Sequence, residues 1–159
     1  MARRFSKFRF VAILVAGAIA GLTACEYYFP RPCEASAKLG DSGPEITVEI
    51  VPMHPYLAEY RRSLVLHRKG LPDQRIEMFP DTGGYSRTQL YRCPDGTLLV
   101  AGFFDAFNID PVKHNIVRHN ENAAHAGVYL GAFDRTKTHD WRFIDASRSP
   151  ERELVAQGI

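Results

Sequence analysis

Short stretches of alternating apolar and polar residues, separated by turn-forming residues, constrain the fold of this chain more than any other feature. Along residues 45–51 the side chains of Ile46, Val48 and Ile50 share one face, and polar side chains occupy the other. A period of two residues is typical of a β-strand with one buried face. Because sustained helical periodicity is almost absent elsewhere, we expect an all-β domain.

Seven segments show a strand-like pattern, and Gly, Pro and Asp separate most of them. Turn residues at such regular spacing predict hairpins, because glycine supplies the positive φ that tight turns need. We therefore predict an antiparallel all-β fold, a small barrel or sandwich of about seven strands. The expected strands cover residues 45–51, 60–68, 74–79, 85–92, 98–109, 128–133 and 141–144.

Two regions near the C-terminus depart from the strand pattern. Residues 111–127 are polar and rich in Asn and His, which predicts a long loop. Ser149 followed by Pro150 is typical of a helix start, with serine as the N-cap and proline at the first helical position. We expect a short C-terminal helix from there to about Gln157.

The N-terminus carries a cationic flank followed by an uncharged segment. Arg3, Arg4, Lys7 and Arg9 precede residues 10–24, a run of 15 residues without charge. As a helix this run would cover roughly 22 Å, short of a bilayer core of roughly 30 Å. The arrangement predicts an export signal. An uncleaved membrane anchor, a buried core helix and export by the twin-arginine route stay open as alternatives.

The end of the uncharged segment has a specific motif. The sequence Leu22-Thr23-Ala24-Cys25 resembles the lipobox of bacterial lipoproteins, and the resemblance covers about the first 25 residues. It implies that Cys25 becomes the mature N-terminus and carries a thioether-linked diacylglycerol, usually with a third acyl chain such as palmitate. Glu26, rather than Asp, follows the cysteine, which is similar to the sorting pattern for the outer membrane facing the periplasm.

Removal of the signal changes the charge of the chain. The full sequence has 20 Lys and Arg against 18 Asp and Glu, and the first 24 residues hold four of the cations and no acid. The remainder therefore has 16 cations and 18 acids, a net charge of −2, which argues against a nucleic-acid partner. We predict a signal peptide at 1–24, a lipidated tether at 25–44 and a single β-domain at 45–159.

The tether assignment rests on prolines and glycines without apolar periodicity in residues 26–44. Three aromatic residues, Tyr27, Tyr28 and Phe29, follow the lipidation site directly. Aromatic rings favour the boundary between lipid headgroups and acyl chains, so these side chains are expected either there or packed on the domain.

Two cysteines remain once Cys25 is assigned to the lipid. Cys33 and Cys93 would occupy an oxidising compartment, where paired thiols form disulfides. Closing a loop of about 60 residues would stabilise the fold by roughly 4 kcal/mol. We predict a Cys33–Cys93 disulfide, with two free thiols as the alternative.

Candidate catalytic and metal-binding residues are sparse. Asp81-Thr82-Gly83 resembles the Asp-Thr-Gly motif of aspartic proteases, but it occurs once and is better explained as a turn. A calcium loop could use Asp105, Asn108 and Asp110, but a turn at the end of a strand explains these residues better. A ligand platform could use Trp141 and Phe143, but a strand of the core is the favoured interpretation. No cofactor is predicted. The remaining candidates are His114, His119 and His125, ligand types for zinc or copper whose spacing favours solvated loop positions.

These observations favour a membrane-anchored, non-catalytic binding or structural module of the bacterial cell envelope. Its partner would be an envelope protein or peptidoglycan, in addition to the membrane that holds Cys25. Two alternatives stay open. One is a small periplasmic enzyme or metal-binding protein that uses His114, His119 and His125. The other is an inhibitor or immunity lipoprotein.

Overall fold

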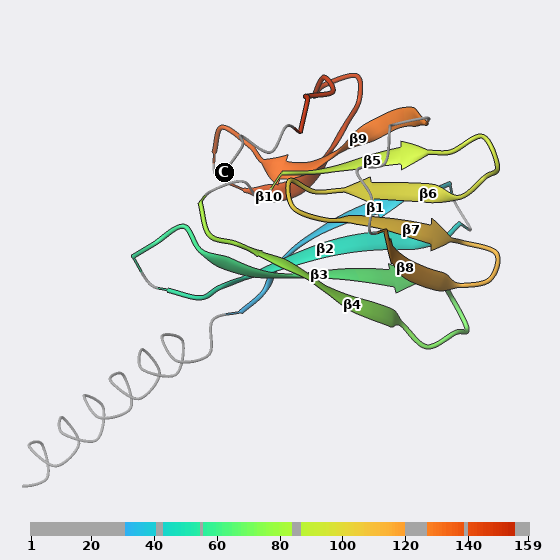
Figure 1. The fold of residues 1–159 in the computed structure, drawn as a ribbon, viewed down its shortest axis with the longest axis horizontal. Coiled ribbons are helices and arrows are strands. Elements are labelled where there is room, and N and C mark those ends of the chain that lie inside the picture. Colours follow the sequence, from blue (N-terminus) through green and yellow to red (C-terminus); the bar gives the residue numbers. More distant parts are fainter. Residues whose placement is uncertain are drawn as a thin grey trace, which may run out of the picture. The chain divides into compact units, whose positions relative to one another are not determined.

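A computed structural model describes residues 31–40, 43–54, 56–83, 87–119, 127–138 and 140–154. The chain divides into Met1–Arg31 and a compact unit Pro32–Ile159, and the description below concerns this compact unit. The described residues form ten strands in two antiparallel sheets and contain no helix (Figure 1). The all-β antiparallel fold is thus confirmed. In the same residues there is no helix long and apolar enough to cross a membrane.

The first sheet is a four-stranded meander in chain order, and the second has six strands in the order β10-β9-β5-β6-β7-β8. Neighbouring strands in both sheets run antiparallel. The first sheet contains β1 (Cys33–Lys38), β2 (Glu45–Pro52), β3 (Tyr60–His67) and β4 (Gln74–Asp81). The second contains β5 (Thr88–Arg92), β6 (Leu98–Ala101), β7 (Ala106–Asp110), β8 (Asn115–His119), β9 (Val128–Arg135) and β10 (Trp141–Asp145).

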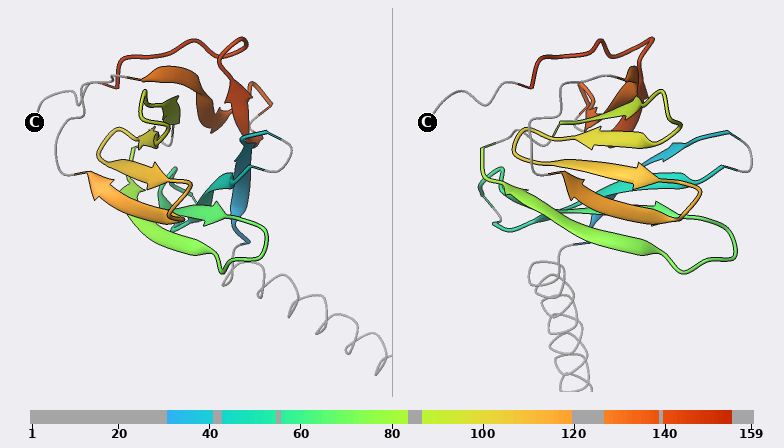
Figure 2. Two further views of the ribbon diagram at one scale, coloured as in Figure 1. Left: turned by 90° about the vertical axis from the view of Figure 1, so that its right-hand side faces the viewer. Right: turned by 45° about the vertical axis from the view of Figure 1, so that its right-hand side comes forward.

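Alternating side chains explain which face of each sheet is buried. In β2, Ile46, Val48 and Ile50 are buried and their neighbours are only partly so, as the period of two predicts. Leu64 and Leu66 occupy the equivalent inward positions of β3. These side chains belong to one hydrophobic cluster with residues of the second sheet, so the two sheets share a core (Figure 2).

The Trp141 side chain joins the two sheets. It is buried in the shared core, and its Nε1 donates a hydrogen bond of 2.8 Å to the backbone oxygen of Val48. Phe143, on the same strand, packs on Phe133 with ring centroids 5.0 Å apart. The edges of the sheets also approach each other, β1 near β10 and β4 near β8. The described strands nevertheless form two separate sheets and not a closed barrel.

The first strand lies within the segment expected to be a tether. β1 pairs with β2 along its whole length, from Cys33 opposite Ile50 to Lys38 opposite Glu45. Its inward side chains are Ala35 and Ala37, both buried. Alanine contributes little to an apolar alternation, which is why the sequence pattern predicted no strand here. The compact unit therefore includes residues before position 45, within the segment expected to be a tether.

Together with β1, two further differences raise the strand count from about seven to ten. The single strand expected at 98–109 is divided into β6 and β7 by a turn closed by a 2.7 Å hydrogen bond from Gly102 N to Asp105 O. The expected loop at 111–127 contains β8, which pairs with β7 and buries Ile116 partly against the core. A strand on the sheet edge needs few apolar residues, so its sequence resembles a loop.

The predicted C-terminal helix is absent from the described residues 149–154. The chain leaves β10 through a turn in which Ser147 N donates to the Asp145 side chain and Ser149 N donates to the Asp145 backbone oxygen. The Ser149 side chain accepts a hydrogen bond from Arg87 and does not cap a helix. Tertiary contacts thus use the groups that would have started the helix; residues 155–157 lie outside the described residues.

Gly131 lies at an irregularity of β9 where only glycine fits. The register with β5 shifts between Leu90 and Tyr91, which pair with Gly131 and Tyr129. Gly131 has φ +149°, and a Cβ there would lie 2.4 Å from Ile144 O. We expect Gly131→Ala to lower the free energy of unfolding by about 3 kcal/mol. Urea unfolding checks this value.

The matched control is Gly70→Ala. Gly70 also has a positive φ, +86°, but no atom lies within 4 Å of the added Cβ. Gly70→Ala is expected to lower the free energy of unfolding by about 1 kcal/mol, because only the backbone conformation disfavours alanine there. Equal losses for the two variants would show that the crowding at Gly131 has no energetic effect.

Candidate functional site

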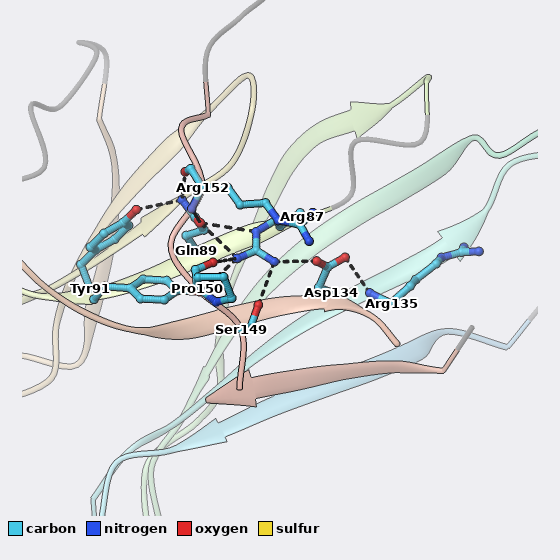
Figure 3. Close-up of polar contacts among 9 residues, drawn as sticks. Arg87, Gln89, Tyr91, Asp134, Arg135, Ser149, Pro150 and Arg152 are labelled. Carbon is cyan, nitrogen blue, oxygen red and sulfur yellow. Dashed lines mark hydrogen bonds and ion pairs between the residues drawn. The ribbon is translucent and has the colours of Figure 1, made fainter. Parts of the chain in front are cut away.

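A cluster of hydrogen-bonded polar side chains lies on the face of the second sheet away from the shared core. Gln89 and Tyr91 project from β5 on this face, and Asp134 belongs to the neighbouring strand β9 (Figure 3). The segment 146–154, after β10, returns across this face. We call this set the Arg87 cluster; its members are Arg87, Gln89, Tyr91, Tyr129, Asp134, Ser149, Pro150 and Arg152.

Arg87 is the centre of the cluster and is buried. Its Nη1 donates to Asp134 Oδ2 at 2.7 Å and to Ser149 Oγ at 3.0 Å. Its Nη2 donates to the Pro150 backbone oxygen at 2.8 Å and to the Tyr129 hydroxyl at 3.1 Å. Nε lies 3.4 Å from Gln89 Oε1. Every nitrogen of the guanidinium thus has an acceptor within the chain.

The Gln89 side chain binds the returning segment as a neighbouring strand would. Its Oε1 accepts a hydrogen bond from Arg152 N, and its Nε2 donates to Arg152 O, both at 2.8 Å. Nε2 also donates to the Tyr91 hydroxyl at 2.8 Å. Because Gln89 is fully buried, these bonds satisfy amide groups that would otherwise be costly to bury. Leu154 then covers the small hydrophobic cluster around Tyr91.

The electrostatics of the cluster keep its two hydroxyls protonated. Burial, followed by interaction with Glu151, raises the pKa of Tyr91. Burial also raises the pKa of Tyr129, and the positive charge of Arg87 opposes that effect. Neither tyrosine can therefore act as a base near neutral pH, and the Asp134 carboxylate of the cluster is paired with Arg87. What this arrangement does is hold the segment 146–154 against the sheet.

A second buried arginine connects the two sheets. Arg62, on β3, donates from Nε to Phe79 O at 2.9 Å, from Nη1 to Thr88 Oγ1 at 3.2 Å and from Nη2 to Asp105 Oδ1 at 3.2 Å. Asp105 Oδ2 accepts a 2.6 Å hydrogen bond from Phe79 N. Desolvation lowers the pKa of Arg62, and the charges of Asp105 and Asp81 oppose that shift. This ion pair fastens β3 and β4 to the β6–β7 turn.

The acidic residues singled out in the sequence are separated by the fold. Asp81 ends β4 and accepts a hydrogen bond from Gly83 N at 3.1 Å, in keeping with a turn. Asp105 pairs with Arg62, whereas Asp110 Oδ1 accepts hydrogen bonds from Val112 N and Lys113 N in the β7–β8 turn. The oxygens of Asp105 and Asp110 are therefore committed to separate partners within the chain.

The histidines of the predicted loop are also separated. His114 precedes β8 and its Nε2 lies 2.8 Å from Pro72 O, whereas His119 ends the same strand. Five residues of extended chain span roughly 16 Å, too far for a shared metal ion. His125 lies outside the described residues. Among the residues the structure describes, no group of three His, Cys, Asp or Glu side chains is placed to hold a metal ion.

The two cysteines of the domain are free thiols in the structure, so the predicted Cys33–Cys93 disulfide is not formed there. Cys33 is exposed at the start of β1 in the first sheet. Cys93 is partly buried in the β5–β6 turn and packs on the small cluster around Tyr91, on the outer face of the second sheet. The two thiols thus belong to different sheets. Cys25 lies outside the described residues.

Sequence patterns overlooked the buried arginines, although one signal was available. Arg62 lies on the same face of β3 as the inward residues Leu64 and Leu66, so a charged residue occupied a position at which the strand pattern predicts a core side chain. Its acid partner lies 43 residues away, and the Ser149 partner of Arg87 lies 62 residues away.

Comparisons of the chain with protein-family models, with curated proteins and with solved structures find no match.

Proposed function

We propose that this protein is a lipoprotein of the bacterial cell envelope, anchored through Cys25, with a non-catalytic binding or structural β-domain. The observation that carries the proposal is Leu22-Thr23-Ala24-Cys25 at the end of a short uncharged run behind a cationic flank. Two or more acyl chains on Cys25 would give stable anchoring. Glu26 after the cysteine is similar to the sorting pattern for the outer membrane, so the proposed anchor lies in that membrane and faces the periplasm.

The use of buried polar groups supports a non-catalytic domain. The buried cations of the described residues are Arg62 and Arg87, and each directs its donors to groups of the chain itself. A guanidinium that stabilises a transition state needs a donor available to the substrate. The two arginines instead hold strands and the C-terminal segment together.

The architecture suits a domain that presents a surface. We infer that the two sheets act as the layers of a sandwich, because they share one core and their edges approach at β1 with β10 and at β4 with β8. Such a domain offers rigid strand faces to a partner. The anchor would restrict that partner to envelope components, a protein or peptidoglycan.

Replacement of the lipidated cysteine tests the proposal. The Cys25→Ser protein is expected to incorporate no labelled palmitate and to leave the membrane fraction, because serine cannot form the thioether. Radiolabelling and fractionation of cells that produce the full chain measure both effects. Cys33→Ser is the matched control and should retain label and location, since Cys33 begins a strand of the folded domain. Unchanged label and fractionation in Cys25→Ser would refute the proposed anchor.

A further inference from the structure

We propose that the β2–β3 loop inserts apolar side chains into the headgroup region of the bilayer that holds the lipid anchor. This inference rests on the proposed function and specifies which surface of the domain faces the membrane. The loop residues that carry it are Met53, Tyr56 and Leu57, whose exposed fractions are 51%, 84% and 53%.

The loop lies at the end of the domain where β1 begins. Cys33 pairs with Ile50, two residues before β2 ends at Pro52, so the start of the domain and the β2–β3 loop share one end of the first sheet. Figure 1 shows the connection between β2 and β3 extending beyond this end. We call it the tether end.

The length of chain before β1 limits how far the tether end can be from the membrane. The chain covers eight residue-to-residue steps from Cys25 to Cys33. Fully extended, they span roughly 25–30 Å, and any more compact conformation spans less. Because the anchored chain joins the domain at the tether end, we expect this end to face the lipid, and the covalent linkage favours the bilayer as the partner of the loop.

The β2–β3 loop has an ordered base and projecting apolar side chains. Met53 N donates to Glu59 O at 2.9 Å and closes the base, and Tyr56 N donates to His54 Nδ1 at 3.2 Å. Tyrosine and leucine presented on a loop of this kind suit a membrane interface, since the tyrosine hydroxyl remains in the polar layer. Ordering the loop before insertion lowers the entropic cost of binding.

Further aromatic and cationic residues lie toward the tether end of their strands and turns. Phe79 near the end of β4 and Phe104 in the β6–β7 turn are both about half exposed. The Arg135 guanidinium lies 4.5 Å from the centroid of the Tyr60 ring, and Arg61 is exposed next to it. Tyr60 and Arg135 are partly buried, whereas Arg61, Phe79 and Phe104 are available to the phosphates and acyl chains of a lipid surface. At the opposite end of the domain, by contrast, the exposed large apolar residues Leu71, Val112 and Val128 are aliphatic.

The test places a fluorophore in the loop of the full-length protein. Purified Tyr56→Trp protein is reconstituted in phosphatidylethanolamine and phosphatidylglycerol vesicles with brominated acyl chains, which quench tryptophan in the bilayer. We expect its emission to shift to shorter wavelength and to lose intensity relative to unbrominated vesicles. Val112→Trp is the control, because Val112 is 83% exposed in the β7–β8 turn at the opposite end. Its emission should not change. The wild type supplies the background from Trp141, which is buried.

Flotation of the vesicles separates this inference from the proposed function. If both variants float but Tyr56→Trp is quenched no more than Val112→Trp, the loop does not insert, whereas the anchor stands. A blue shift without quenching would mean that a protein surface covers the loop and would also overturn the inference. Protein that lacks an acyl chain by mass and does not float would refute the proposed function and this inference with it.

Discussion

Asp105→Ala is expected to lower the free energy of unfolding of the domain by about 3–5 kcal/mol. The side chains of Arg62 and Asp105 have exposed fractions of 0% and 1%, so the substitution would leave a buried guanidinium without its counter-ion. It would also remove the acceptor of Phe79 N. Urea unfolding followed by the fluorescence of Trp141, which lies in the shared core, measures the loss.

The control for this prediction is an ion pair of better geometry on the surface. Arg75 donates to both carboxylate oxygens of Glu49 at 2.6 Å, and the side chains of Arg75 and Glu49 are 54% and 12% exposed. Arg75→Ala should cost only about 0–1 kcal/mol, because water replaces the lost partner. If Asp105→Ala cost no more than Arg75→Ala, burial of the Arg62 pair would have no special energetic role.

Arg87→Ala is expected to release the segment 146–154 from the second sheet and to destabilise the domain by about 2–4 kcal/mol. The substitution removes the bonds to Ser149 and Pro150 and leaves the Asp134 carboxylate without its cation. Limited trypsin digestion reports release directly, because Arg148 and Arg152 lie within this segment. Cleavage there should become faster than in the wild type.

Arg142→Ala provides the comparison for Arg87→Ala. Arg142 forms an ion pair with Asp140 at 2.7 Å, but both side chains are more than half exposed. Digestion and urea unfolding should match the wild type. A wild-type cleavage rate in Arg87→Ala would show that the segment 146–154 is held by other contacts, such as those of Gln89 with Arg152.

Local patterns were sufficient for the strands that build the core. Ile46, Val48 and Ile50 alternate with polar neighbours, and the structure buries all three. Trp141 was expected in the core and lies there. The turn at Pro94-Asp95-Gly96 also follows the local sequence, since Gly96 has φ +84° and donates to Cys93 O. In each case the pattern that predicted the outcome lies within a few residues of chain.

Patterns failed where pairing with a distant strand supplied the stabilisation. β1 has only two inward alanines, and it becomes a strand because β2 offers it a free edge. β8 is similarly polar and forms on the exposed edge of β7. Ser149 and Pro150 have the local preferences of a helix start, but Arg87 binds both. Tertiary hydrogen bonds outweigh a helix preference of this size.

The sequence by itself determined the fold class and the resemblance to a lipobox, because alternation and the order Leu22-Thr23-Ala24-Cys25 are properties of neighbouring residues. Only the tertiary structure decided how many strands form, that Arg62 meets Asp105, and that Arg87 holds the C-terminal segment. It also decided that the β2–β3 loop lies at the end where β1 begins. These contacts join residues far apart in the chain, so they arise from the packing of two sheets and not from local preference.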